Sequence, residues 1–277
     1  MTANSADAEL LRNTKVVQQI DPLFDAAVEQ PLTRNTLLRL AAGTLGAIRV
    51  PNMLSPEVCA ELTANLANAE FDTYDERRIY PPIAKFGPAV YDYYLDGKLR
   101  PEYWIDAERA ERNWSGIVGS NDPMFSIVDQ LVAAWSGPVS RATVNGRELF
   151  AGMIRELKGD PRLHFDEVVR EFPEVFDLTP VAQLGFNCYI SLPPSGGELN
   201  VFRRRWRPDD EHNRVGFGWS QTVVKDEPHL CITPELGEGI LFDTRNYHFI
   251  TPSTEGRRLT LAFFVGVTAD NRLIIWS

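Results

Sequence analysis

The sequence predicts an α+β fold in which a layer of helices packs on an antiparallel β-barrel or sandwich. Up to about residue 145, apolar residues recur at helical spacing behind good helix-start signals. After the Asn145-Gly146 turn, short runs of β-forming residues alternate with Gly- and Pro-rich turns. The 277 residues, 44% of them hydrophobic, are enough to bury one sizeable core. We therefore expect a single domain over 1–277, mainly helical in 1–145 and barrel-like in 146–277.

The composition excludes several classes of partner. The net charge of -10 argues against nucleic acid and anionic membranes, which require a basic surface. The three cysteines lie far apart without a CxxC pair, which favours a reducing cytoplasm over a disulfide framework or a structural zinc site. The first fifteen residues have no apolar signal core, and no run is long enough to predict a membrane span. The oligomeric state stays open, with a homodimer among the alternatives.

Helices are expected at three places in the first part. Residues 36–47 carry leucines and alanines at helical spacing, and a short strand over 48–53 follows. Ser55-Pro56-Glu57 then supplies an N-cap serine, a proline for the first turn and an acid beside it. Asp122-Pro123 starts a third helix in the same way. Its expected apolar stripe consists of Phe125, Val128, Leu131, Val132 and Trp135.

The segment 74–114 is dense in aromatic residues and is interrupted by Pro81-Pro82, Gly87-Pro88 and Gly97, so it cannot be one helix. Long structured loops often wall a pocket, whereas aromatic side chains more often simply cover a core. Both interpretations stay open here.

Strands are expected throughout the second part, because β-forming runs there are separated by turn residues. The expected strands are 149–157, 182–192, 198–206, 215–224, 229–233, 240–242 and 259–265.

The stretch 239–264 holds the most informative pattern. We expect its two strands to be joined by a turn-rich corner that contains His248. Arg258 opens the second strand, and Thr260 follows on the same face because strand side chains alternate. An imidazole and a guanidinium facing one cavity would hold a metal ion and a carboxylate side by side.

A second metal-ligating segment is needed, and His164-Phe165-Asp166 is the candidate. Of the four histidines, His212 lies in an acidic loop and His229 follows a proline, so both are interpreted as ordinary structural residues. His164 differs because Asp166 lies two residues further on, where both side chains point to one face at a strand end. Two imidazoles and one carboxylate on one face of an octahedron are the ligand set of non-heme Fe(II) oxygenases.

With these residues in place, the region 147–265 resembles the Fe(II)/2-oxoglutarate-dependent dioxygenases of the double-stranded β-helix (jelly-roll, cupin-like) fold. The motifs that carry the resemblance are IRELKGDPRLHFDE, CYISLPPSGGELNVF and ITPELGEGILFDTRNYHFITPSTEGRRLTLAFF, together with the helix MLSPEVCAELTANL. The interval of 84 residues between the two histidines (248 - 164) is long for a compact member and suggests an insertion at 203–214.

The resemblance implies a site and a set of cofactors. Its iron ligands would be His164, Asp166 and His248, and its cofactors Fe(II), the co-substrate 2-oxoglutarate and O2. Arg258 would bind the distal carboxylate of 2-oxoglutarate, and Thr260 and Asn187 would assist. Strand alternation turns the neighbouring Arg257 to the other face, so Arg258 is preferred.

The resemblance also implies a reaction: hydroxylation of an unactivated C–H bond, with succinate and carbon dioxide as co-products. Related halogenases have a small residue at the position of Asp166, which leaves room for chloride on the iron. A carboxylate at this position therefore predicts hydroxylation rather than halogenation.

The layout is most similar to small standalone oxygenases that act on free or N-substituted amino acids, and to their alkaloid-halogenating relatives. We therefore expect a small carboxylate-bearing substrate. Its candidate contacts are Tyr80, Ile83 and Phe86 in the aromatic loop, Arg155 before the iron motif, and Arg203 and Arg205 on one face of the basic run.

Several alternatives accompany this hypothesis. The basic run 203–207 is equally well explained as a solvated face paired with the acids that follow it, and Arg155 as part of a buried ion pair. A peptidyl or protein hydroxylase, or an alkaloid or natural-product hydroxylase, would share the motifs. A barrel that holds zinc as a hydrolase, or a non-catalytic metal-binding barrel, is a further alternative.

Overall fold

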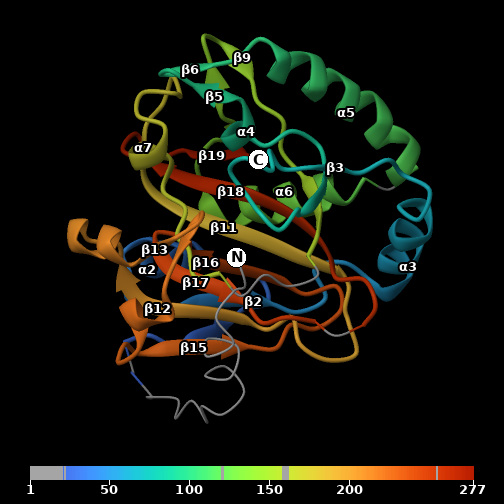
Figure 1. Cartoon of the computed structure of the whole chain (residues 1–277). Helices are drawn as coiled ribbons and strands as arrows, with labels where there is room; N and C mark the ends of the chain where they lie inside the picture. Colours follow the sequence, from blue (N-terminus) through green and yellow to red (C-terminus); the bar gives the residue numbers. More distant parts are fainter. Residues whose placement is uncertain (1–20, 22, 120–121, 158–161, 254) are drawn as a thin grey trace.

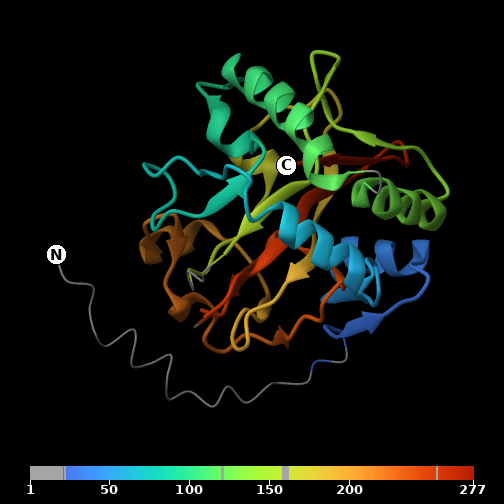
Figure 2. The ribbon, with the colours of Figure 1, turned by 90° about the vertical axis from the view of Figure 1, so that its right-hand side faces the viewer.

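The computed structural model describes residues 21, 23–119, 122–157, 162–253 and 255–277. The N-terminal stretch examined above for a signal core lies outside this part. A large and a small β-sheet form the core, and the longer helices gather along one side of the large sheet (Figure 1, Figure 2). The predicted α+β class is confirmed. No helix in the described ranges has the length and apolar character needed to span a bilayer.

The large sheet contains ten of the described strands, and strands from the first 145 residues extend it at both edges. Its order is β1 (Ala26–Val28), β2 (Ala47–Val50), β16 (Gly239–Asp243), β11 (Pro180–Ser191), β18 (Leu259–Thr268), β10 (Met153–Glu156), β4 (Ala84–Phe86) and β3 (Asp72–Thr73). Off this path, β19 (Leu273–Trp276) pairs with β18 and with β7 (Val139–Arg141).

The small sheet has the order β15 (His229–Ile232), β12 (Leu199–Arg205) and β17 (Asn246–Ile250), and a bridge between His164 and His248 adds to its edge. The chain crosses repeatedly from one sheet to the other, with β10, β11, β16 and β18 in the large sheet and the His164 bridge, β12, β15 and β17 in the small one. This alternation is the double-stranded β-helix that the sequence predicts. Two-stranded pairs lie outside it: β5 (Tyr94–Leu95) with β6 (Lys98–Leu99), β8 (Thr143–Val144) with β9 (Arg147–Glu148), and β13 (Arg214–Val215) with β14 (Gly218–Trp219).

Two of the predicted helix starts are confirmed by their caps. Ser55 accepts a hydrogen bond from Val58 N at the start of α3 (Pro56–Asn65), and Asp122 accepts one from Met124 N at the start of α6 (Pro123–Trp135). The remaining helices are α2 (Arg34–Ala41), α4 (Val90–Tyr93), α5 (Glu102–Val118), α7 (Val168–Glu171) and the 3₁₀ helices η1 (Pro208–Asn213) and η2 (Gln221–Val224).

The sequence interpretation of the helices was wrong in three respects. Helix α2 ends at Ala41 rather than near residue 47, because Gly43 adopts a positive φ of 73° and the chain turns into β2. In α6, Phe125 is 74% exposed and Val132 45% exposed, so only part of the expected stripe is buried. Helix α5 was missed, although its buried residues Tyr103, Ala107, Ala110, Ile117 and Val118 follow helical spacing.

The strands also required corrections. The first strand of the barrel covers only Met153–Glu156 of the expected 149–157, and 215–224 is not one strand but part of β13, all of β14 and η2. The Asn145-Gly146 turn is confirmed: both residues have positive φ, 52° and 75°, and they join β8 to β9. His248 does not lie in a turn; it lies on β17, which the sequence analysis did not separate from the corner around it.

A buried ion pair stabilises the turn between β16 and β17. Arg245 contacts Asp243 through Nε–Oδ1 at 2.7 Å and Nη2–Oδ2 at 2.8 Å, and both residues are buried. The same guanidinium donates to the carbonyl oxygens of Ala41 and Val181, at 2.8 and 3.2 Å. It therefore joins α2 and β11 to the turn that leads into His248.

We predict that Arg245→Met lowers the free energy of unfolding by about 3–5 kcal/mol, because it leaves the buried Asp243 carboxylate incompletely compensated. Arg272→Met is the matched control: Arg272 pairs with Asp270 across two residues at the same 2.7 Å, but on the surface. That change should cost no more than about 1 kcal/mol. Urea unfolding of both variants measures the difference, and equal costs would contradict the role given to Arg245.

Candidate metal centre

The two histidines of the site lie directly opposite each other on adjacent segments. His164 N donates to His248 O at 3.0 Å, and His248 N donates to His164 O at 2.8 Å. In an antiparallel pair, residues that exchange both backbone hydrogen bonds project their side chains to the same face. The imidazole centroids are accordingly 4.2 Å apart, although the residues are 84 positions apart in the chain (248 - 164).

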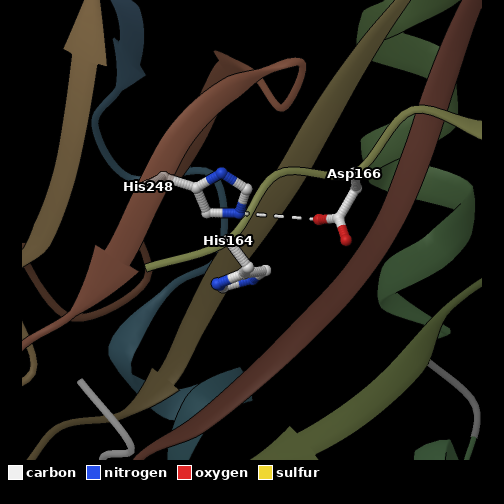
Figure 3. A group of neighbouring side chains, drawn as sticks. All are labelled: His164, Asp166 and His248. Atoms are coloured by element: carbon white, nitrogen blue, oxygen red, sulfur yellow. Dashed lines mark ion pairs between the residues drawn. The ribbon is translucent and has the colours of Figure 1, made fainter. Parts of the chain in front are cut away.

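Asp166 is brought to the same place by its own backbone contacts with the turn before β17. Asp166 N donates to Thr244 O at 2.9 Å, and the Thr244 hydroxyl donates back to Asp166 O at 3.0 Å. The carboxylate Oδ2 lies 3.5 Å from His248 Nε2. Figure 3 shows the three side chains converging on one point.

Both imidazoles have the tautomer that a metal ligand needs. His164 Nδ1 lies 3.0 Å from Arg162 O, and His248 Nδ1 lies 3.0 Å from Asn246 O. A carbonyl oxygen can only accept, so each neutral ring carries its proton on Nδ1 and leaves the Nε2 lone pair free. Burial, together with the neighbouring His248, lowers the pKa of His164 to about 4, so this ring is neutral at physiological pH.

The carboxylate completes a usable ligand set. Burial opposes ionisation of Asp166, but its contact with His248 and the nearby His164 and Arg155 outweigh burial and lower its pKa. One ligand atom from each of His164, Asp166 and His248 lies within 4.8 Å of the others. Two nitrogens and one anionic oxygen suit a divalent transition metal, and a single-sided set leaves coordination positions open.

A second polar cluster lies beside this triad, around Arg258. Arg258 is 2% exposed, its guanidinium lies 5.0 Å from the centroid of the Tyr189 ring, and in the described part of the chain only its Nε has a hydrogen-bond partner, Gly197 O at 3.2 Å. Both terminal guanidinium nitrogens find no hydrogen-bond partner among the described residues, and neither do the hydroxyls of Tyr189 and Thr260. Buried donors left in this way are costly, and an anionic ligand such as a carboxylate could satisfy them.

The strand pairing explains how this cluster forms. Arg258 directly precedes β18, in which Thr260 lies opposite both Tyr189 on β11 and Arg155 on β10. Burial lowers the pKa of Arg258 below its usual value, and it raises the pKa of Tyr189, which therefore stays a neutral hydroxyl. Arg257 points elsewhere and pairs with Glu156 at 2.7 Å, as strand alternation predicts.

An inner cavity of about 170 Å³ connects the two clusters. The triad and Arg258 line it, and so do Asn187, Arg155 and Ile83. Arg155 donates to Asn187 Oδ1 at 2.7 Å, and its Nε has no partner in the described part of the chain. No ion pair of Arg155 is found among the described residues, so the structure gives no support to the alternative of a buried ion pair.

An outer cavity of about 760 Å³ leads into the inner one. Five residues line both cavities, and we call them the neck: Tyr91, Arg162, Glu171, Phe172 and Phe217. Tyr80 lines only the outer cavity and is 65% exposed. Phe86 lines neither, because it is buried in the core against Trp114.

The arginines of the basic run are not brought to these cavities. Arg203 pairs with Asp21 at 2.5 Å, and Arg205 pairs with the buried Asp243 at 2.9 Å. Neither lines the inner or the outer cavity. The acids that pair with Arg203 and Arg205 are therefore distant in sequence. Of the acids that directly follow the basic run, Asp210 pairs with Arg204.

Residues 25–277 match the family model of the carrier-protein-independent halogenase WelO5. A relative from Streptantibioticus cattleyicolor, named L-gamma-glutamyl-L-propargylglycine hydroxylase, is 38% identical over 261 residues, which are 92% of this chain and 96% of the relative. The chain belongs to the WelO5 halogenase family.

Two more distant comparisons give a further relative and a shared fold. The leucinostatins biosynthesis cluster protein S of Purpureocillium lilacinum is 28% identical over 227 residues, covering 74% of this chain and 90% of that protein. The crystal structure of an N-substituted L-amino acid dioxygenase from Burkholderia ambifaria superposes with a TM-score of 0.56 at 14% identity, covering 89% and 92% of the two chains. This structure shares the fold of the WelO5-family chain described here.

In this WelO5-family chain, sequence reasoning missed two residues that line or flank the site. Tyr189 could have been found, because it is two positions after Asn187 on the same strand and so shares its face. Glu171 lies five positions after Asp166, and nothing in the local pattern distinguishes it from the neighbouring acids.

We predict that His164→Ala and His248→Ala each abolish stoichiometric binding of Fe(II) or Co(II) to the purified protein. Removing merely a hydrogen-bond partner of a metal ligand costs about 10–100-fold in affinity, and removing the ligand should cost at least as much. His229→Ala is the control, since His229 is also buried but stacks on Phe202 away from the triad. Anaerobic equilibrium dialysis measures the stoichiometry, and undiminished metal in either triad variant would refute its role.

Proposed function

We propose that this chain is an Fe(II)/2-oxoglutarate-dependent hydroxylase that acts on a small, carboxylate-bearing amino-acid derivative. The observation that carries the proposal is the pairing of a two-histidine, one-carboxylate triad with a buried guanidinium whose terminal nitrogens lack partners. The first is the ligand set of non-heme iron oxygenases, and the second suits the far carboxylate of a 2-oxo acid.

His164, Asp166 and His248 would hold the iron. Bound Fe(II), with 2-oxoglutarate and O2, supplies the oxidation of an unactivated C–H bond to an alcohol, and succinate and carbon dioxide are the co-products. The hydrogen bonds from Nδ1 to backbone carbonyls would keep the two imidazoles oriented. Thr244 would hold Asp166 in place through its paired backbone contacts.

Arg258, Tyr189 and Thr260 would together bind one carboxylate of 2-oxoglutarate, since their free donors are buried side by side. Asn187 and Arg155 line the cavity between this cluster and the triad, so they would face the remainder of the co-substrate or the substrate. Two guanidinium groups in one cavity balance a dianionic 2-oxo acid better than any neutral ligand.

Hydroxylation is favoured over halogenation by Asp166. A carboxylate here occupies the position that halogenases leave to chloride, and the 38% identical relative is named as a hydroxylase. The names of that relative and of the Burkholderia ambifaria enzyme both describe amino-acid derivatives. We extend that substrate class to this chain, and we propose that 1–277 acts as one domain in the cytoplasm.

Arg258→Gln should weaken the binding of 2-oxoglutarate by about 10–150-fold, because a hydrogen bond to a charged group contributes roughly 1.5–3 kcal/mol. Arg257→Gln is the matched control: it removes the neighbouring guanidinium, whose contact is Glu156 rather than the cavity. The dissociation constant of 2-oxoglutarate for Arg257→Gln should differ from the wild-type value by less than about 3-fold. Calorimetry with the metal-loaded, oxygen-free protein makes the comparison, and an unchanged constant for Arg258→Gln would exclude it from the site.

With Fe(II), 2-oxoglutarate and O2, an amino-acid derivative that is a substrate should stimulate succinate formation and gain one oxygen atom. The product should be hydroxylated even when chloride is in excess. Mass spectrometry of the product together with succinate assays tests this, and a panel of free amino acids, γ-glutamyl dipeptides, N-substituted amino acids and peptides defines the class. A chlorinated product, or stimulation by long peptides alone, would overturn the proposal.

A further inference from the structure

The neck between the two cavities carries a carboxylate that the proposed chemistry does not use. Glu171 is the last residue of α7, which begins two residues after the metal ligand Asp166. It lines both the inner and the outer cavity, and among the described residues it is the one carboxylate of the neck. A substrate that reaches the triad from the outer cavity must pass beside it.

Glu171 has no cationic partner in the described part of the structure. Its one hydrogen bond is from the backbone amide of Glu167, which reaches Oε2 at 3.0 Å. Basic side chains close to it in the chain or in the cavity have other contacts: Arg170 pairs with Glu167 at 2.9 Å, Arg214 pairs with Glu211 at 3.2 Å, and Arg162 of the neck donates to Val215 O at 3.2 Å. A carboxylate in a cavity without a counter-ion requires either a proton or a positively charged ligand.

The charges around Glu171 also favour a proton or a positively charged ligand at its carboxylate. Burial and the nearby negative charge of Asp166 raise the pKa of Glu171 to about 8, and the hydrogen bond from the Glu167 amide and the charge of Arg214 offset this only in part. The unpaired anion is therefore unfavourable in the ligand-free site. A cation delivered by the substrate would relieve this cost.

We propose that Glu171 binds a protonated amine of the substrate and thereby selects amine-bearing molecules over otherwise identical ones that lack the amine. The inference rests on the proposed function, because it assigns a substrate contact to the same cavity. Arginines outnumber acids in the surrounding cavity: Arg162 lines the neck, and Arg77, Arg78 and Arg214 line the outer cavity together with Glu76 and Asp96. The charge pattern thus fits a zwitterion, with the ammonium at Glu171 and carboxylate groups toward the arginines.

Pairs of compounds that differ only in the amine test this directly. L-γ-glutamyl-L-propargylglycine and glutaryl-L-propargylglycine form one pair, and N-methyl-L-leucine and 4-methylpentanoic acid form another. Titration into oxygen-free protein loaded with Fe(II) and 2-oxoglutarate measures binding without turnover. At least one amine-bearing probe should bind the wild-type protein about 10–100-fold more tightly than its partner, as expected for a charge-assisted contact.

Glu171→Gln should remove this preference, mainly by weakening the binding of the amine-bearing probe. The glutamine side chain keeps the shape of glutamate and an oxygen that can accept from the backbone N–H of Glu167, but it carries no charge. Glu167→Gln is the matched control. It neutralises a carboxylate on the same turn that pairs with Arg170 and lines neither cavity. This variant should keep the preference.

A preference that survives in Glu171→Gln would overturn the inference. Wild-type protein that binds no amine-bearing probe more tightly than its partner would overturn it as well, and this result does not depend on how a variant folds. The binding of 2-oxoglutarate in the same samples reports separately on the proposed function. Tight 2-oxoglutarate binding without amine preference would refute only the role of Glu171, whereas amine preference without 2-oxoglutarate binding would refute only the oxygenase.

Discussion

Two backbone hydrogen bonds between His164 and His248 fix the geometry on which the rest of the site depends. The pairing of β17 with β12 sets the register of this bridge, with His248 opposite Val201. A slip by one residue would exchange the two faces of β17 and turn Tyr247 toward the triad. Tyr247 instead packs on Phe165 and Trp219 on the opposite side, so the aromatic cluster there stabilises the register that the metal ligands need.

The charge of the whole chain and the charge of its cavity have opposite signs. The chain carries a net charge of -10, yet three guanidinium groups line the inner cavity, those of Arg155, Arg162 and Arg258, against the two carboxyl groups of Asp166 and Glu171. Because a buried charge acts over a few ångströms in a weakly screening interior, the local set decides which ligand binds. The net charge bears on partners at the surface and is no guide to this pocket.

Sequence reasoning placed side chains correctly where the placement depends on neighbours along one strand, and it failed where the placement depends on tertiary pairing. His164 with Asp166, and Arg258 with Thr260, follow from alternation within a few residues. The basic run was ambiguous because its partners, Asp21 and Asp243, lie 182 and 38 residues away from Arg203 and Arg205. Strand β17 was missed because turn-forming residues on both sides obscured five strand residues, and α5 because aromatic residues masked its helical spacing.

Membership in a family named for a halogenase does not decide the reaction, because a fold supports different chemistries through a few side chains. Here the segment from His164 to Glu171 concentrates the deciding residues. In the proposed site, Asp166 would fill the metal position on which hydroxylation and halogenation differ, and α7 begins two residues after it and ends with Glu171 in the neck. The proposed reaction outcome and the proposed substrate selection therefore depend on residues five positions apart, so a variant at one should also be assayed for the property assigned to the other.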